Sequence, residues 1–126
     1  MTFFRRFESF NQGVTFDTAK QRCENRNGRL AEPRNQQQLN ALIEINIQHF
    51  WLGATYSRQI GIWRWSSDNA ILDSVGGFWN AGEPSQGSNE NCLQFFEQGQ
   101  DDGNCFVMLP YVCEFGGIGP VSICIS

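Results

Sequence analysis

Four carboxylates and a hydroxyl stand near one another in the second half of the sequence. Glu83-Pro84-Ser85 is followed by Glu90 and then by the pair Asp101-Asp102. Calcium is a hard cation that takes six to eight oxygen ligands, many of them carboxylates. These residue types therefore predict a calcium site made of Glu83, Ser85, Glu90, Asp101 and Asp102. An acidic stretch among Gly, Asn and Ser residues is also typical of a solvated surface loop, and the residues alone leave that alternative open.

Two helices are expected ahead of this acidic region. Thr15 can cap the first helix, and Asn27-Gly28 is a typical helix end. Asn35 can cap the second. Each helix has an apolar stripe at helical spacing, which indicates packing against a core; the stripes are Phe16, Ala19 and Cys23, then Leu39, Leu42, Ile43 and Ile47.

The character of the sequence changes after residue 49, where short aromatic runs alternate with Gly, Asn and Ser clusters. Such runs are typical of strands. We expect strands at 50–53, 62–65, 92–96, 105–109 and 111–115. Pro110 indicates a bulge or an edge, because proline cannot donate to a strand ladder. The tract from about 66 to 104 has little regular signal, and long irregular loops in a compact domain are usually functional or disordered.

Composition limits the kind of protein. A chain of 126 residues is the size of one domain, with a core at about 3–115 and a tail at 116–126. The net charge of -4 and the lack of a Lys/Arg run argue against nucleic-acid binding. No apolar run approaches the roughly 18 residues needed to span a membrane.

Five cysteines stand at positions 23, 92, 105, 113 and 124, and His49 is the single histidine. Closely spaced Cys/His pairs of the zinc-binding type are absent from the sequence, so disulfides are the better interpretation. Disulfides persist in oxidising compartments, which predicts a secreted, extracellular protein. The count alone allows fifteen ways to form two bridges and leaves one thiol over.

The order and spacing of these features resemble the C-type lectin-like domain over residues 15–115. Trp51-Leu52-Gly53 is similar to the W-I-G-L core strand of that family, and Glu83-Pro84-Ser85 is similar to its E-P-N loop. Glu90 precedes Cys92 as the second acidic ligand does in the family. Asp101-Asp102 stands at the W-N-D position before Cys105, and Cys113-Glu114 matches the terminal C-E.

The resemblance implies an α+β fold in which two helices flank antiparallel sheets and a long loop region binds calcium. It also implies two disulfides, Cys23 with Cys113 and Cys92 with Cys105. They would contribute roughly 4 to 5 and 3 kcal/mol in the chain-entropy account. Cys124 is then left over, which suggests an interchain bridge and a homodimer.

Calcium-dependent sugar binding is the function that the resemblance implies. The Glu83–Pro84 bond is cis in the family. Two neighbouring sugar hydroxyls would contact the calcium while donating to its acidic ligands, since a hydroxyl has both lone pairs and a proton. We expect the sugar to contact Glu83, Ser85, Glu90, Asp101 and Phe96. No bond is broken, so the chain is not expected to be an enzyme.

The sugar preference rests on departures from the mannose-type pattern, which has Asn where Ser85 and Asp101 stand. An ionised Asp101 can only accept hydrogen bonds. The chain is similar to small secreted invertebrate galactose-binding members with an E-P-S motif, so we expect galactose or GalNAc on cell surfaces or microbes, as in innate immunity. Phe96 could stack on the apolar face of galactose.

Other functions stay open on the sequence. A mannose- or fucose-type lectin is one alternative, and a protein-interaction module without sugar binding is another. Some family members hold a second calcium ion, whose ligands would fall near Tyr56, Ile60, Gln86 and Asn91. None of these residues is acidic, so a second calcium site is not expected.

Overall fold

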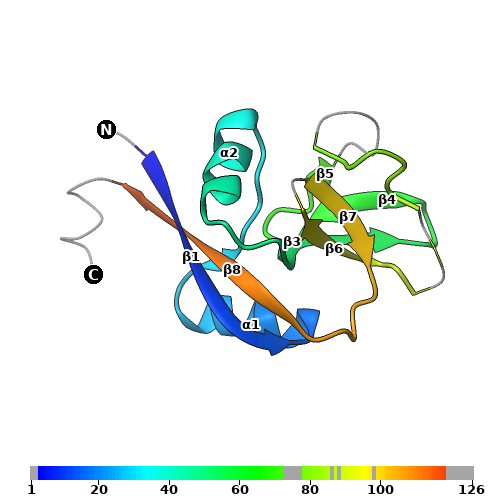
Figure 1. Cartoon of the computed structure of the whole chain (residues 1–126), viewed down its shortest axis with the longest axis horizontal. Coiled ribbons are helices and arrows are strands. Elements are labelled where there is room, and N and C mark those ends of the chain that lie inside the picture. Colours follow the sequence, from blue (N-terminus) through cyan, green and yellow to red (C-terminus); the bar gives the residue numbers. More distant parts are fainter. Residues whose placement is uncertain (1–2, 73–77, 86, 88, 98, 119–126) are drawn as a thin grey trace.

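The two ends of the domain form one long antiparallel ribbon (Figure 1). In the computed structural model, which describes residues 3–72, 78–85, 87, 89–97 and 99–118, β1 (Phe3–Val14) pairs with β8 (Leu109–Ile118). The register shifts between Phe10 and Val14, opposite Pro110. This shift confirms the bulge expected at the proline, whose nitrogen carries no hydrogen for the ladder.

The first helix, α1 (Phe16–Asn25), begins where Thr15 accepts a hydrogen bond from the backbone N–H of Thr18. Its apolar stripe of Phe16, Ala19 and Cys23 is buried, as expected. The chain leaves the helix through Asn27 in the left-handed region, at φ 66°. Both predicted ends of this helix are therefore confirmed.

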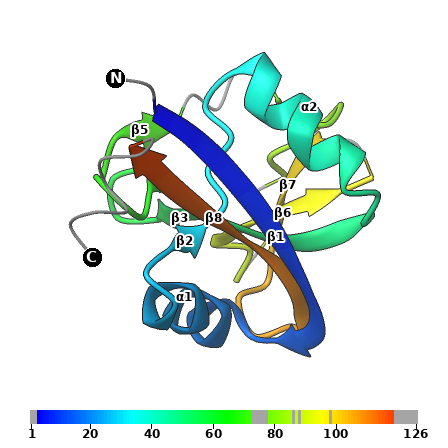
Figure 2. The same cartoon turned by 90° about the vertical axis from the view of Figure 1, so that its left-hand side faces the viewer.

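The second helix, α2 (Gln36–Glu44), is capped by Asn35, whose side chain accepts from the backbone N–H of Gln38 at 2.8 Å. Leu39 and Leu42 are buried. Ile47 lies beyond the helix, because Asn46 turns the chain with φ 65°. The helical stripe predicted through Ile47 is thus one turn too long. The two helices lie on opposite sides of the β1–β8 ribbon (Figure 2).

The central strand is β3 (His49–Ser57), which joins the ribbon to the rest of the sheet. It runs antiparallel to β4 (Ile62–Trp65) and β6 (Cys92–Phe96), and parallel to β8 at Trp51 and Tyr111. The short strands β5 (Ile71–Leu72) and β2 (Arg29–Leu30) pair with β4 and β8. β7 (Gly99–Gly103) pairs with β6. The α+β architecture is confirmed.

Both disulfides that the resemblance implied are present. Cys23–Cys113 joins α1 to β8, and Cys92–Cys105 joins the start of β6 to the segment after β7. Cys124 lies outside the described residues. Around these bridges the apolar side chains form two clusters, one containing Phe50, Phe95 and Trp63 and the other containing Trp51 and the Cys23–Cys113 bridge.

The predicted strand at 105–109 is wrong. Residues 104–108 form a turn, in which the side chain of Asn104 accepts from the N–H of Phe106 and its carbonyl accepts from the N–H of Val107. Phe106, Val107 and Met108 are exposed. Four strands were not anticipated, namely β1, β2, β5 and β7, and both β5 and β7 lie in the tract described above as irregular.

Candidate metal centre

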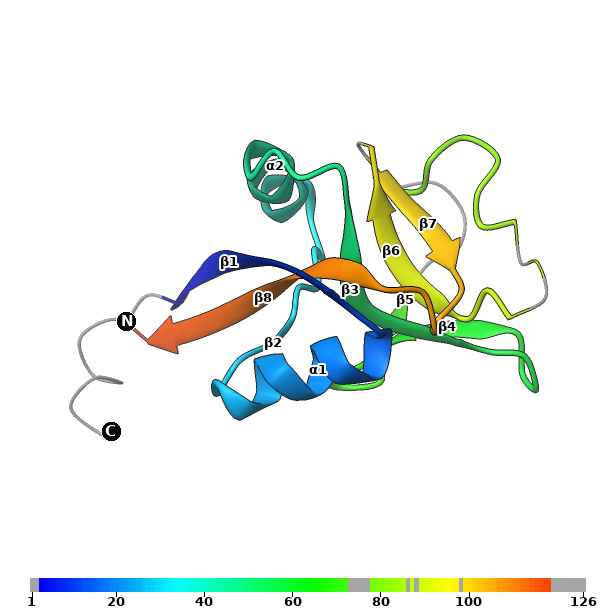
Figure 3. The same ribbon diagram turned by 60° about the horizontal axis from the view of Figure 1, so that its bottom comes forward.

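The hairpin of β6 and β7 positions the Asp101-Asp102 pair (Figure 3). Asp101 pairs with Gln94 and Asp102 pairs with Leu93 across the ladder. Neighbouring strand residues point to opposite faces, so the two aspartates leave the strand in different directions. Asp102 is 1% exposed and Asp101 is half-buried.

The loop that carries Glu83 is anchored on the free edge of β7. Trp79 forms an isolated parallel bridge with Gln100, and the N–H of Asn80 donates to the carbonyl of Gln100 at 2.9 Å. The centroid of the Trp79 ring lies 5.4 Å from that of the Trp63 ring, so Trp79 holds the start of the loop against the core. A turn follows, in which the N–H of Glu83 donates to the carbonyl of Asn80. The Glu83–Pro84 peptide bond is cis, as in the family that the sequence resembles.

Three of the expected ligands converge at this edge. One carboxylate oxygen from each of Glu83, Asp101 and Asp102 lies within 4.8 Å of the others. Among the described residues, these three carboxylates form the one group of Asp, Glu, Cys or His side chains that lie close enough together to hold a metal ion. Three carboxylates so close together repel one another, and a divalent cation between them would remove that repulsion.

Ser85 connects the remaining expected ligand to the cluster. Its hydroxyl lies 2.9 Å from Glu90 Oε1 and 3.1 Å from Asp102 Oδ1, and its backbone N–H donates to Glu83 and Asp102 at 2.9 and 3.0 Å. A hydroxyl has one proton, so the two carboxylates compete for it. Glu90 also accepts from the N–H of Gly87 at 2.8 Å. The structure therefore brings all five expected residues into one hydrogen-bonded group, with Glu90 at its margin.

The cluster changes the acidity of Glu83. Burial, together with hydrogen bonds to Asp101 and Asp102, raises the pKa of Glu83 from 4.5 to about 7. The negative charge of Asp101 acts in the same direction, while the N–H of Ser85 opposes it. Without a metal ion, the Glu83 carboxyl is therefore partly protonated near neutral pH. A cation that binds the Glu83 carboxylate has to displace this proton.

Two side chains contact the site without having been anticipated from the sequence. The Gln94 amide donates to Asp101 Oδ2 at 3.1 Å, and its oxygen lies 2.8 Å from His49 Nε2. Arg58 donates from Nε to Asn91 Oδ1 at 2.8 Å and from Nη2 to the carbonyl of Gly87. Its guanidinium therefore joins the two sides of the segment that carries Glu90. No motif or spacing in the sequence marks either contact.

Phe96 lies on the same strand as Gln94, farther from the cluster. It is 39% exposed, while its neighbour Phe95 is buried in the core. The Phe96 ring meets the His49 ring edge to face at 5.0 Å. Of the two neighbouring rings, Phe96 is therefore the one exposed to solvent.

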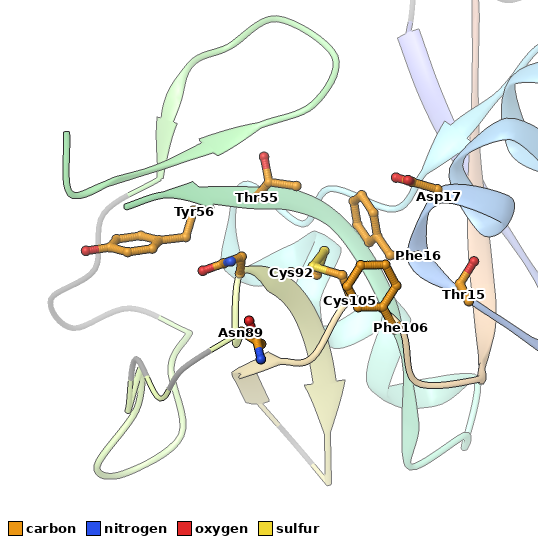
Figure 4. Close-up of a pocket in the computed structure, with 10 residues that line it drawn as sticks. Thr15, Phe16, Asp17, Thr55, Tyr56, Asn89, Cys92, Cys105 and Phe106 are labelled. Atoms are coloured by element: carbon orange, nitrogen blue, oxygen red, sulfur yellow. A yellow bond between two sulfur atoms is a disulfide. The ribbon is translucent and has the colours of Figure 1, made fainter. Parts of the chain in front are cut away.

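A separate hollow of about 340 Å³ lies beside the Cys92–Cys105 bridge (Figure 4). Figure 4 shows Phe16 and Phe106 at one end and Tyr56 at the other. Asn89 and Asn91 contribute amides, and Asp17 is the one carboxylate among the lining side chains of this hollow. Its polar groups are therefore mostly neutral, unlike those of the Glu83 cluster.

A sequence model of the lectin C-type domain matches residues 12–115. The chain belongs to the C-type lectin family. A curated relative, C-type lectin domain family 4 member M of Gorilla gorilla gorilla, is 33% identical over 64 residues, which cover 51% of this chain and 17% of the relative. The chain thus spans much less than half the length of that relative.

Solved structures show the same fold. A calcium-independent type II antifreeze protein has a TM-score of 0.79 and 24% identity, covering 90% of this chain and 88% of its own. A mouse scavenger receptor C-type lectin carbohydrate-recognition domain has a TM-score of 0.78 and 22% identity, and the match covers 88% of this chain and 87% of that domain. TC14, a C-type lectin from the tunicate Polyandrocarpa misakiensis, has a TM-score of 0.77 and 21% identity, and the match covers 89% of this chain and 98% of TC14.

In the part of the chain that the structure describes, no helix combines the length and the apolar character needed to cross a bilayer.

Proposed function

We propose that this C-type lectin domain binds carbohydrate through one calcium ion held by Glu83, Ser85, Glu90, Asp101 and Asp102. The observation that carries the proposal is the convergence of Glu83, Asp101 and Asp102 within 4.8 Å, in a domain of this family. The oxygen-only donor set suits calcium, which prefers carboxylate and hydroxyl ligands. When bound, calcium supplies open coordination positions for two neighbouring sugar hydroxyls.

The residues of the chain fix the orientation of the sugar. Each sugar hydroxyl has one proton, which it donates to Glu83, Glu90 or Asp101, and hydrogen bonds to charged acceptors are stronger than neutral ones. These contacts offset the loss of water from the hydroxyls. The domain is proposed to bind and not to transform its ligand, because binding through hydroxyls requires no general acid, base or nucleophile.

Galactose and GalNAc are the favoured sugars. Asp101, when ionised, cannot donate to a sugar hydroxyl as an asparagine would, which argues against the mannose-type arrangement. Phe96 exposes an aromatic ring on the neighbouring strand, suited to the apolar face of galactose. Mannose or fucose binding is the alternative within this function.

The test is retention on immobilised galactose and on immobilised mannose, with calcium and then with a chelator. We expect calcium-dependent retention on galactose and release by the chelator, with weaker retention on mannose. Retention on mannose alone would reverse the sugar preference. Absence of calcium binding in a direct titration would contradict the proposal and favour a protein-interaction module.

Location and assembly belong to the same proposal. Two disulfides suit an oxidising environment, so we place the domain outside the cell, facing glycans on cell surfaces or microbes. A homodimer linked through Cys124 would present two sites. Tyr56, Ile60 and Asn91 bring no carboxylate to the position of a second calcium ion, so one ion per chain is expected.

A further inference from the structure

A hollow of about 630 Å³ lies between β1 and the C-terminal end of α1. Tyr111 of β8 contributes to its lining, and the other lining residues are Phe10, Asn11, Gln12, Arg22, Asn25 and Arg26. None of these belongs to the candidate metal centre. The helix α1 also lies apart from the β6–β7 hairpin that carries Asp101 and Asp102 (Figures 1 and 3).

Two arginine side chains are held at this hollow. Arg22 and Arg26 are four residues apart, which makes them neighbours on the helix surface, and like charges at this spacing repel one another. Arg22 Nη1 donates to Gln12 Oε1 at 2.8 Å, and the guanidinium carbon of Arg26 lies 4.6 Å from the centre of the Phe10 ring. Contacts with β1 therefore fix both guanidinium groups beside each other despite their repulsion.

No carboxylate neutralises this pair of charges. In the part of the chain that the structure describes, neither Arg22 nor Arg26 forms an ion pair. The nearby carboxylates of Glu24 and Glu8 pair instead with Lys20 and Arg6, at 3.1 and 3.4 Å. Among the described residues, none that lines the hollow is acidic. The hollow is thus locally positive in a chain whose net charge is -4.

Helix stability accounts for only part of this arrangement. The C-terminal end of a helix carries a partial negative charge and favours a cation nearby, which suits Arg22 in the last turn of α1. The helix does not require the second cation to lie over an aromatic ring of β1. A guanidinium has five N–H donors, and Arg22 uses one of them for Gln12. Most of the donors of this pair are therefore left for a ligand.

The chemistry of the lining selects the class of ligand. Guanidinium groups bind oxyanions with paired hydrogen bonds, as in Arg–carboxylate and Arg–phosphate contacts. The amides of Asn11, Gln12 and Asn25 both donate and accept, which matches hydroxyl groups. Little apolar surface is offered, because Arg26 covers the Phe10 ring and Tyr111 is buried. These features favour a ligand with many hydroxyls and one negative group over a peptide with apolar side chains.

We propose that this hollow is a calcium-independent site for an acidic sugar, whose carboxylate or sulfate group is bound by Arg22 and Arg26. The neighbouring amides bind the hydroxyls of the same sugar. The site uses none of the residues proposed to hold calcium, so it does not rest on the proposed function. The domain would then bind negatively charged glycans on one side and neutral sugars at the carboxylate cluster.

The test is calorimetric titration of the whole chain, dialysed free of calcium. The probes are trigalacturonic acid, which carries carboxylates, sulfated neocarratetraose, which carries sulfates, and neutral maltotriose. We expect at least one acidic probe to bind about tenfold or more tightly than maltotriose, and the stronger of the two identifies the charged group. Absence of a preference for either acidic probe would overturn the proposal.

Variants locate the binding. Arg22→Gln and Arg26→Gln should each weaken binding of the acidic probe about tenfold, the effect of losing a hydrogen bond between charged groups. Arg26→Lys keeps a cation for the Phe10 ring and should fold as the parent does, yet it loses the planar fork and should recover only part of the affinity. The matched control is Arg64→Gln on β4, which removes the same charge and should bind within about twofold of the parent. An equal loss in Arg64→Gln would show that net charge and not the hollow attracts the probe.

A hexamer of glutamate separates sugar recognition from attraction of negative charge. It presents carboxylates without hydroxyls, so we expect it to bind about fivefold or more weakly than the preferred acidic sugar. Equal affinity for the two would overturn the assignment to a sugar and favour an acidic peptide.

Discussion

Ser85 is the residue on which the candidate site depends most. Its backbone N–H and its hydroxyl together reach three carboxylates, those of Glu83, Glu90 and Asp102. An asparagine at this position would present a carbonyl oxygen and an amide donor, whereas serine presents one short hydroxyl. Ser85 therefore keeps Glu90 in contact with the cluster although Glu90 is not one of its three converging carboxylates.

Ser85→Ala tests this role. The substitution removes the hydroxyl that links Glu90 to Asp102 and keeps the backbone N–H contacts. We expect calcium affinity to fall about tenfold, since a hydrogen bond to a charged group contributes about 1.5–3 kcal/mol. Titration of calcium by calorimetry measures the change. Ser57→Ala, on β3, is the control that should bind as the parent does, and an unchanged affinity in Ser85→Ala would contradict the role.

The raised pKa of Glu83 should make calcium affinity depend on pH. Because the metal-free protein holds a proton on Glu83 up to about pH 7, calcium has to displace that proton at lower pH. We expect calcium affinity to rise between pH 5.5 and 7 and to level off above about 7.5. Calcium titrations across this range, repeated on Glu83→Gln, would show the rise lost in the variant. A flat profile in the parent protein would be inconsistent with the raised pKa.

The same proton has an effect of opposite sign on folding. The folded-state pKa of Glu83 lies above its unfolded value of 4.5, so its contribution favours the metal-free fold below about pH 4.5 and is lost as the pH rises through about 7. Calcium reverses this trend because it stabilises the charged form of the cluster. The melting temperature should therefore depend more strongly on calcium at pH 7.5 than at pH 5.

The β3–β4 turn and the loop before β6 are joined by Arg58. Its guanidinium donates to Asn91 and to the carbonyl of Gly87, on either side of Glu90. In family members with a second calcium ion, that ion would lie in this region. Here an arginine side chain contacts the same loop, and it brings five donors in a fixed plane.

Arg58→Ala should therefore weaken calcium binding several-fold with little loss of stability, because the side chain is exposed. Arg58→Lys should restore only part of the affinity, since lysine cannot make both contacts in one plane. Arg64→Ala, on β4, serves as the control. Calcium titration and thermal melting separate the two effects, and a variant that loses stability but keeps calcium affinity would show that Arg58 supports only the fold.

The Cys92–Cys105 bridge connects the two ends of the β6–β7 hairpin that presents Asp101 and Asp102. Replacing both cysteines with serine avoids a free thiol. We expect a loss of about 3 kcal/mol of stability from a loop of this length and a weaker calcium site. Chemical unfolding and calcium titration measure the two changes. Unchanged calcium affinity would show that the strand pairing alone positions the aspartates.

Local signals explain which elements could be predicted. Both helices have a capping side chain and an apolar stripe within about ten residues, so their starts were correct. β1 gave no such signal, because Phe4, Phe7 and Phe10 are three residues apart and the partner strand β8 lies about a hundred residues away. Its pairing is a property of the tertiary structure.

The same reasoning applies to β7 and to the segment after it. β7 consists of Gly, Gln and Asp, which strands disfavour, and its pairing with β6 provides the order that propensity does not. The apolar run at 105–109 looked like a strand, but the turn at Asn104 prevails there. The family spacing indicated that Glu83, Asp101 and Asp102 would lie close together, as they do. The contacts of Gln94 and Arg58 depend on strand register and side-chain direction, which the sequence does not display.

A group of charged side chains, two of them buried, links β8 to β2 and to the loop before α2. Glu114 on β8 accepts from the backbone N–H of Glu32 and pairs with Arg29 at 2.9 Å, and Glu32 pairs with Arg34. Glu32 and Glu114 are almost fully buried. Removing one member of such a group leaves an uncompensated buried charge, which is costly. This group joins the β1–β8 ribbon to the loop before α2.

Cys124 is expected to link two copies of the chain through a disulfide. The other four cysteines are paired within the chain, so Cys124 is the thiol left for a partner. We expect a dimer on a non-reducing gel that becomes a monomer with reductant, and a monomer in Cys124→Ser. Two linked sites on a galactose-coated surface would bind about a hundredfold or more tightly than one. Cys124→Ser should lose this gain while keeping its affinity for free galactose, because the substitution leaves each site intact. A parent protein that migrates as a monomer without reductant would contradict the covalent dimer, and equal retention of both proteins on the surface would show that the bridge contributes nothing to binding.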